Sequence, residues 1–147
     1  MGVKKDYKIF VLDGNMFSLN LYEQQLINLG YTDVSPFQVA NNCFEALPDR
    51  PDIIFLDHSI NYLNGVDILR KIKSFNPDIY VIFIAGLEDV EAVVSSLKYG
   101  AFDFIVRDDN DGRALENIIA KIFRVKQLLK KNTTDFYRNY IHSNSIL

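Results

Sequence analysis

Residues 51–65 read PDIIFLDHSINYLNG, and this stretch decides the fold that the sequence predicts. An apolar run, IIFL, leads without a break to an acid, Asp57, and a polar loop and Gly65 follow. Such a run is typical of a strand buried on both faces, as in a parallel sheet covered by helices. Sheets of this kind bind ligands at the C-terminal ends of their strands. Asp57 is therefore either a reactive group or a simple strand-ending acid.

The same alternation of an apolar run and a helical period recurs along the whole chain. We expect five strands, at Tyr7–Leu12, Asp33–Val39, Asp52–Asp57, Ile79–Ala85 and Ala101–Val106. A helix is expected after each strand, at Met16–Leu29, Ala40–Leu47, Asn64–Phe75, Glu88–Tyr99 and Asp111–Lys131. This pattern predicts an α/β fold with a doubly wound, five-stranded parallel sheet and helices on both faces.

Pro36 lies within the second strand, and proline cannot donate a hydrogen bond to a neighbouring strand. That strand is therefore expected at an edge, which with right-handed crossovers favours the flavodoxin-like order 2-1-3-4-5. Strands one and three are then neighbours, so Asp13 and Asp57 end in one crevice. Two carboxylates ~4 Å apart repel by roughly 4 kcal/mol, and a divalent cation or a shared proton relieves this. Arg107, at the end of the last strand, is placed to pair with a phosphate there.

Composition narrows the class of protein. The chain has 147 residues and a net charge of −3, which fits one globular domain over 1–130 and a tail or linker over 131–147. No apolar run approaches the ~20 residues that span a bilayer, and the N-terminus lacks the features of a signal peptide. A single cysteine, Cys43, fits a reducing compartment. We therefore expect a cytoplasmic protein without membrane contact, and its acidic body argues against a nucleic-acid surface.

The last predicted helix carries a second signal besides core packing. Leu115, Ile118, Ile122, Val125 and Leu129 step by three and four residues in turn, which is the coiled-coil period. Two heptads are fewer than the three or four that make this interpretation firm. The helix therefore either packs on the sheet and continues as a linker, or joins two copies of the chain in a homodimer.

Three segments resemble the receiver domain of bacterial two-component response regulators: KIFVLDGN, PDIIFLDHSINYLNGVDILRKIK and VIFIAGLEDVEAVVSSLKYGAFDFIVRD. The resemblance covers residues 7 to about 125, and the last segment is most like receivers of the nitrogen-regulator type. It implies that a histidine kinase transfers a phosphoryl group to Asp57. It also implies Mg²⁺ held by Asp57, Asp13 and the backbone carbonyl of Ser59. The phosphorylated domain would switch a partner or an output domain absent from this chain, as in transcription regulators, without being an enzyme itself.

The sequence departs from the family pattern at several positions that bind the metal or the phosphoryl group, or that act in the switch. Gly14 stands where a second metal-binding acid is expected, so the Mg²⁺ site should be weak. Ala85 replaces a Ser or Thr and cannot donate to a phosphoryl oxygen, a hydrogen bond worth about 1.5–3 kcal/mol. Phe104 keeps the aromatic switch position without a phenol oxygen. Arg107 replaces a lysine, and Asp108 replaces the proline that follows it.

Two functions remain open at this point. In the first, the chain is a signalling receiver that is phosphorylated on Asp57. In the second, it is a pseudo-receiver that never carries phosphate and acts as a protein-binding or dimerisation module. Such a dimer would use the last helix, or the face of the fourth helix, fifth strand and fifth helix that the family commonly uses. A flavin-binding role on the same fold is disfavoured, because the loop DGNMFS lacks the Ser, Thr and Gly run that wraps a phosphate.

Overall fold

A single parallel sheet forms the centre of the computed structural model, which describes residues 6–60, 62–107 and 112–144. The strand order is β2-β1-β3-β6-β7, so the predicted order 2-1-3-4-5 is confirmed. The strands of this sheet are β1 (Lys8–Leu12), β2 (Asp33–Phe37), β3 (Ile53–Asp57), β6 (Tyr80–Ala85) and β7 (Asp103–Val106). The predictions for Asp108 and for a helix start at Asp111 lie outside the described residues.

The central position of β3 follows from its composition. All five residues of IIFLD are buried, and β3 pairs with β1 on one side and with β6 on the other. The second strand, β2, pairs only with β1 in the part of the chain described, with Pro36 opposite Val11. Pro36 therefore occupies the edge position that its missing N–H requires.

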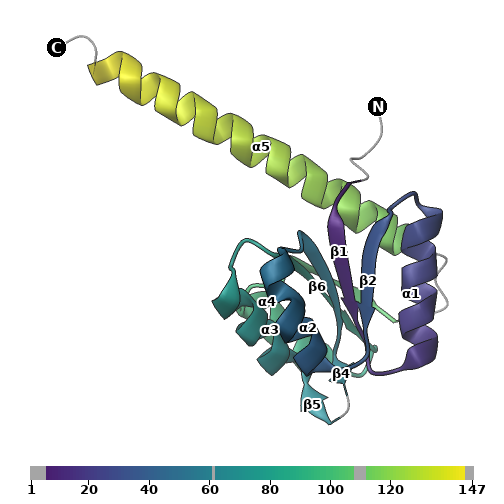
Figure 1. Ribbon diagram of the computed structural model, residues 1–147. Helices are drawn as coiled ribbons and strands as arrows, with labels where there is room; N and C mark the ends of the chain where they lie inside the picture. Colours follow the sequence, from purple (N-terminus) through teal and green to yellow (C-terminus); the bar gives the residue numbers. More distant parts are fainter. Residues whose placement is uncertain (1–5, 61, 108–111, 145–147) are drawn as a thin grey trace.

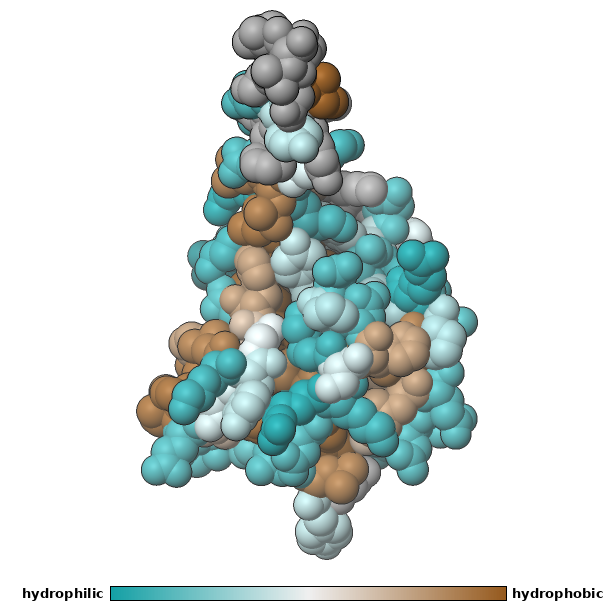
Figure 2. Space-filling model, turned by 90° about the vertical axis from the view of Figure 1, so that its left-hand side faces the viewer, coloured by the Kyte–Doolittle hydropathy of each residue, from teal (hydrophilic) through white to brown (hydrophobic). Residues whose placement is uncertain are grey.

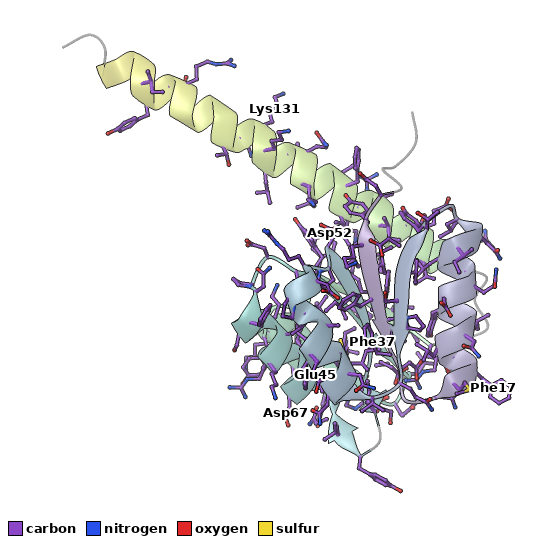
Figure 3. The ribbon with its side chains drawn as sticks, viewed as in Figure 1. Phe17, Phe37, Glu45, Asp52, Asp67 and Lys131 are labelled. Carbon is purple, nitrogen blue, oxygen red and sulfur yellow. The ribbon has the colours of Figure 1, made fainter. Side chains whose placement is uncertain are left out.

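The helices cover the two faces of the sheet unequally (Figure 1). Helices α1 (Met16–Asn28) and α5 (Arg113–Asn144) lie on one face, and α2 (Ala40–Ala46), α3 (Gly65–Phe75) and α4 (Val90–Lys98) lie on the other. Each face has its own buried apolar cluster, one including Leu69 and Ile72 of α3, the other Ile119 and Ile122 of α5. Phe37 of β2 points between the sheet and α2, where its ring meets that of Phe10 at 4.8 Å (Figure 3).

The connection after β3 holds a feature that the sequence analysis missed. Two short antiparallel strands, β4 (Ser59–Ile60) and β5 (Leu63–Asn64), form a small hairpin before α3. Gly65 then begins α3 against the end of β3, where a Cβ atom would lie 2.8 Å from the Cα atom of His58. Only glycine allows this close approach. A short 3₁₀ turn, η1 (Leu47–Asp49), was also not predicted.

The last helix is longer than predicted. It continues past the expected end at Lys131 to Asn144 and projects away from the sheet (Figure 1). The predicted end was wrong because residues 132–144, NTTDFYRNYIHSN, contain neither glycine nor proline to stop a helix. A domain boundary near residue 130 stays a prediction. No helix within the described ranges is both long and apolar enough to cross a membrane.

Candidate functional site

The candidate site lies at the C-terminal edge of the sheet, where β1, β3 and β7 end. A cavity of about 340 Å³ is lined there by Asp13, Gly14, Asn15, Ser18, Asp57, Ser59 and Arg107. The structure therefore brings together the two predicted acids, the predicted cation and the Ser59 loop. The strand order explains this, because β1 and β3 are neighbours and their carboxyl ends meet in one crevice.

The carboxylate of Asp57 accepts hydrogen bonds from two other residues of the cavity. Asp57 is only 3% exposed, and its Oδ1 accepts a hydrogen bond from the backbone N–H of Ser59 at 2.8 Å. The Nη2 of Arg107 donates to both of its carboxylate oxygens, at 3.1 Å to Oδ1 and 3.0 Å to Oδ2. Burial raises the pKa of Asp57 above its ordinary value, although the Ser59 N–H and the Arg107 guanidinium act in the opposite direction. The carboxylate is thus held in place but costly to keep charged.

Asp13 has a different environment. It is 2% exposed, and its Oδ1 accepts a hydrogen bond from the backbone N–H of Asn15 at 2.9 Å. The pKa of Asp13 is raised to about 6, mainly by burial; the Asn15 N–H and Arg107 act to lower it, and the neighbouring Asp57 acts to raise it. The second oxygen, Oδ2, is buried and has no hydrogen-bond partner among the described residues. Asp13 therefore lines the cavity and keeps one acceptor that no described donor uses.

Arg107 lies beside the acids because it directly follows β7, whose pairing with β6 fixes its backbone. Its backbone N–H donates to the carbonyl of Ala85 at 2.8 Å, which extends the pairing of β6 and β7 by one residue. Burial acts to lower the pKa of Arg107, but the carboxylate of Asp57 more than offsets this and raises it. The guanidinium is thus a permanent positive charge beside Asp57.

The donor set suits a hard divalent cation that keeps most of its water. The unused Oδ2 of Asp13 is the kind of oxygen that Mg²⁺ prefers, and Asp57 supplies a second carboxylate. No group of three or more His, Cys, Asp or Glu side chains is gathered for a metal within the described ranges. Gly14 adds no side-chain oxygen, so the ion would have few protein ligands. The use of the Ser59 carbonyl as a ligand stays a prediction.

The two predicted switch positions differ in their surroundings. Ala85 is fully buried at the end of β6 and brings no hydroxyl to the site. Phe104 of β7 is 36% exposed and does not line the cavity. His58 does not line the cavity and packs on Phe83 with ring centroids 5.6 Å apart. Its Nε2 lies 3.9 Å from the carboxylate of Asp89, which precedes α4.

Two lining residues were not predicted from the sequence, Asn15 and Ser18. Asn15 caps α1, because its side chain accepts hydrogen bonds from the backbone N–H groups of Phe17 and Ser18. This cap fixes the first turn of α1 beside Asp13 and places Ser18 on the cavity wall. An asparagine directly before a helical period is a recognised N-cap signal, and it was available in the sequence.

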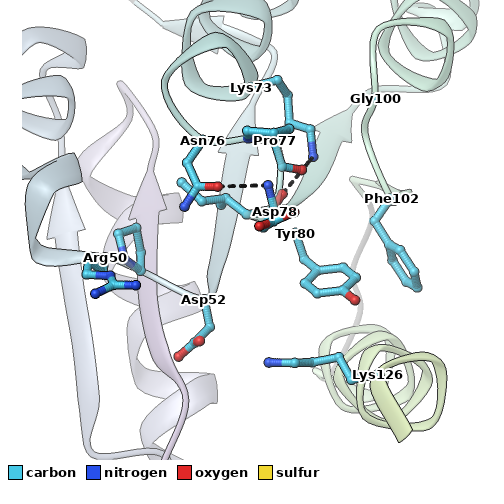
Figure 4. Close-up of a pocket in the computed structure, with 12 residues that line it drawn as sticks. Arg50, Asp52, Lys73, Asn76, Pro77, Asp78, Tyr80, Gly100, Phe102 and Lys126 are labelled. Atoms are coloured by element: carbon cyan, nitrogen blue, oxygen red, sulfur yellow. Dashed lines mark hydrogen bonds between the residues drawn. The ribbon is translucent and has the colours of Figure 1, made fainter. Parts of the chain in front are cut away.

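A larger cavity, of about 470 Å³, lies at the opposite edge of the sheet (Figure 4). One of its cations, Lys73, already donates to the carbonyls of Pro77 and Ile79 at 2.6 and 2.9 Å. One of its two acids, Asp52, accepts a hydrogen bond from the backbone N–H of Lys8 at 2.8 Å. These groups support the loops around them, so the smaller cavity at Asp57 is the better candidate for chemistry.

Comparison with known proteins identifies the family of the chain. The sequence matches the family model of the response regulator receiver domain over residues 9–120. It is 26% identical over 131 residues to the luminescence regulatory protein LuxO of Vibrio campbellii, covering 86% of this chain and 29% of that protein. It is 34% identical over 95 residues to the nitrogen assimilation regulatory protein NtrX of Azorhizobium caulinodans, covering 57% and 21% respectively. The chain thus spans less than a third of the length of these relatives.

Solved structures agree with the sequence comparisons. The receiver domain of NtrX from Brucella abortus superposes with a TM-score of 0.73 at 27% identity, covering 79% of this chain and 98% of that one. A receiver domain from Clostridium thermocellum gives a TM-score of 0.75 at 26% identity, covering 84% and 98%. The chain belongs to the response regulator receiver domain family of two-component systems.

Proposed function

We propose that this domain receives a phosphoryl group on Asp57 from the phosphohistidine of a histidine kinase and thereby switches a partner or an output domain. The observation that supports this is the buried carboxylate of Asp57 at a strand end, oriented by Ser59 and paired with Arg107. In this role the domain is a cytoplasmic signalling switch and not an enzyme with its own turnover. The buried free thiol of Cys43 fits a reducing compartment.

The transfer itself needs a nucleophile and a cation. A carboxylate oxygen of Asp57 attacks the phosphorus, the P–N bond to the kinase histidine breaks, and the imidazole leaves with the bonding electron pair. The carboxylate oxygen that attacks phosphorus must be free of a hydrogen bond from Arg107. Arg107 therefore has to release one of the two oxygens of Asp57 that it now binds. Its guanidinium is then placed to donate to the phosphoryl oxygens, which it can do in a bidentate manner.

A magnesium ion would supply the further positive charge that the transferring phosphoryl group needs. Asp13 and Asp57 would hold it, and the unused Oδ2 of Asp13 is the observation that supports this. Because Gly14 offers no third carboxylate, we expect binding to be weak. Arg107 would carry a larger part of the charge compensation than a single lysine does.

A second candidate function has its own support. Both oxygens of Asp57 are already occupied by Arg107, and Ala85 offers no hydroxyl to a phosphoryl group. A pseudo-receiver of this kind would bind its protein partner with Asp57 unmodified. The ion pair with Arg107 would then serve to hold the loops of the site in one conformation.

Intact-mass spectrometry separates the two functions. The chain is incubated with Mg²⁺ and acetyl phosphate beside two variants, Asp57→Asn and Asp52→Asn. Asp52 is the matched control, because it is a second acid of the same strand region but lies at the opposite edge of the sheet. The receiver function predicts one phosphoryl adduct on the wild type and on Asp52→Asn, and none on Asp57→Asn. The absence of an adduct from all three proteins at high Mg²⁺ concentration would support the pseudo-receiver.

The variants Gly14→Asp and Ala85→Thr test whether restoring the missing carboxylate and hydroxyl groups restores phosphorylation. Gly14 has no positive φ, so an aspartate there meets no backbone strain. Restored carboxylate and hydroxyl groups should raise both the Mg²⁺ affinity and the yield of adduct if the site works in a weakened form. A double variant that gains Mg²⁺ affinity but remains without an adduct would count against phosphotransfer.

A further inference from the structure

The larger cavity lies at the opposite edge of the sheet from Asp57, and the proposed phosphotransfer does not use it (Figure 4). Its volume of about 470 Å³ falls within the ~300–1,000 Å³ that is typical of small-molecule sites. The connections that lead into β3, β6 and β7 form its walls, and α5 contributes Lys126. The cavity is thus built from four separate parts of the chain.

Hydrogen bonds already hold the walls of this cavity in place. The ammonium of Lys73 is occupied by two backbone carbonyls of the connection into β6. In the same connection the backbone N–H of Asp78 donates to the side chain of Asn76 at 2.9 Å. The backbone N–H of Tyr80 donates to the carbonyl of Asp52 at 3.0 Å, which joins this connection to the one that leads into β3. Walls that are fixed in this way need little further ordering when a ligand binds.

Two cations of the cavity, Arg50 and Lys126, are not used in this way. Among the residues that the structure describes, the guanidinium of Arg50 has no hydrogen-bond or ion-pair partner. The ammonium of Lys126 pairs with no described carboxylate and lies over the rings of Tyr7 and Tyr80, 5.2 and 6.0 Å from their centroids. In Figure 4 Lys126 points toward Asp52, and Arg50 lies on the other side of this acid. Both cations are therefore available to a ligand.

The charge of the cavity favours an anion. Three cations and two acids line it, which leaves one net positive charge, and a cleft of one sign attracts a ligand of the opposite sign. On the face that Figure 2 shows, the body of the molecule below the projecting α5 is mainly hydrophilic. A contiguous apolar patch is the usual mark of a protein partner, so this surface favours a small charged ligand.

Tyr80 and Phe102 give the cavity an aromatic wall. Their rings meet edge to face, with centroids 5.2 Å apart and an angle of 80° between the planes, and both side chains are half-buried. Aromatic side chains of this kind bind flat rings by stacking, whatever the identity of the base. An inorganic anion alone would leave this wall without a contact. The cavity therefore suits an anion that also carries a flat ring.

We propose that this cavity binds a small aromatic anion of the nucleoside monophosphate class. The phosphate lies between Arg50 and Lys126, and the base lies against Tyr80 and Phe102. A guanidinium can bind two phosphate oxygens at once, whereas the ammonium acts as a point charge. Because Lys126 belongs to α5, the bound ligand connects this helix to the connections that lead into the sheet. The site is separate from Asp57, so the proposal holds for either proposed function.

Amide NMR titration of the full chain tests the proposal with three probes: AMP, inorganic phosphate and adenosine. The buffer contains EDTA and no Mg²⁺, so that no metal draws phosphate to the cavity at Asp57. AMP should bind saturably, at least roughly tenfold more tightly than inorganic phosphate or adenosine, because only AMP offers both the charge and the ring. The shifted amides should centre on Asp52, Phe102 and Lys126.

Variants of the two cations test where the phosphate lies. Lys126→Gln should weaken AMP binding at least roughly tenfold. Lys131→Gln is the matched control, because Lys131 is an exposed lysine of the same helix that does not line the cavity, and it should change the affinity less than about twofold. Arg50→Asn should weaken binding as well. Arg50 has a left-handed backbone with φ of 65°, which asparagine tolerates, so this variant keeps the turn.

Two further variants test the ring and the sign of the charge. Phe102→Leu keeps an apolar side chain and removes the ring, so it should weaken AMP binding roughly tenfold and leave inorganic phosphate unaffected. Asp52→Asn removes a negative charge between the two cations and should tighten the binding of AMP. A cationic ligand would show the reverse effect.

Circular dichroism of each variant confirms that it is folded. The absence of saturable AMP binding at millimolar concentration would overturn the proposal. Equal affinities for AMP and inorganic phosphate would also overturn it, because the aromatic wall would then have no role. The same holds if Lys126→Gln and Lys131→Gln bind AMP equally well, or if the shifted amides centre on Asp57.

Discussion

The ion pair between Arg107 and Asp57 can be tested by replacing Arg107 with methionine, which keeps the length of the stem and removes the charge. Asp57 would then remain buried with the Ser59 N–H as its only other described hydrogen-bond donor. Hydrogen bonds to a charged group contribute about 1.5–3 kcal/mol. The Arg107 side chain is 35% exposed, so water screens part of this energy. We therefore expect Arg107→Met to lower the free energy of unfolding by about 1.5–2 kcal/mol at pH 7.

The pH dependence of this loss has a definite sign. Burial already raises the pKa of Asp57, and removal of the guanidinium raises it further, because Arg107 lowers it. The cation stabilises only the ionised carboxylate. The loss caused by Arg107→Met is therefore complete above the pKa of Asp57 in the folded variant and decreases as the pH falls from there through the lower pKa of Asp57 in the folded wild type.

The assay is urea unfolding followed by circular dichroism, at several pH values, for wild type, Arg107→Met, Asp57→Asn and the double variant. This double-mutant cycle isolates the interaction between the two side chains. We expect Arg107→Met to cost little in the Asp57→Asn background, and Arg107→Lys to recover part of the stability. An equal cost of Arg107→Met in both backgrounds, at all pH values, would refute the ion pair as the source of the effect.

Two further predictions concern other buried groups. The pKa of Asp13 is about 6 in the folded chain, against ~3.9 for an unfolded aspartate, so its ionisation reduces stability as the pH rises through 6. Asp13→Asn should therefore gain up to about 2–3 kcal/mol relative to wild type between pH 4 and pH 7.5 in urea unfolding, and parallel pH curves would contradict this. Cys43 is fully buried and burial raises its pKa to about 12, so iodoacetamide should label it roughly a thousandfold more slowly than a free cysteine at pH 8. Urea should remove this protection, whereas rapid labelling of the folded chain would show that Cys43 is accessible.

The strand order and the pairing of acids could be predicted because few residues determine them. Pro36 restricts β2 to an edge, and the apolar run before Asp57 requires a strand buried on both faces. Once these two strands are placed, right-handed crossovers leave few arrangements, and the favoured one brings Asp13 and Asp57 together. The position of Arg107 followed from the length of the last strand.

Other features could not be predicted because their signals are short or depend on tertiary contacts. The β4–β5 hairpin has only two residues in each strand, which is too few for an alternating pattern. The orientation of Arg107 toward Asp57, and not toward solvent, depends on the cavity between them. The predicted end of α5 at Lys131 comes too early, because neither glycine nor proline follows it to stop the helix.

Gly14 and Arg107 are best understood as one change in the charge balance of the site. The family pattern places three acids, a lysine and a divalent cation in this cavity, so the acids there need the metal for neutrality. Here Gly14 removes one acid, and Arg107 binds both oxygens of Asp57. The remaining acid, Asp13, takes up a proton near pH 6. Above about pH 6 the two acids and Arg107 therefore leave one net negative charge, against two for three acids and a lysine, which lowers the electrostatic gain from binding Mg²⁺. It follows that Gly14→Asp should increase Mg²⁺ affinity more than Ala85→Thr does, since only the first substitution restores the excess of negative charge.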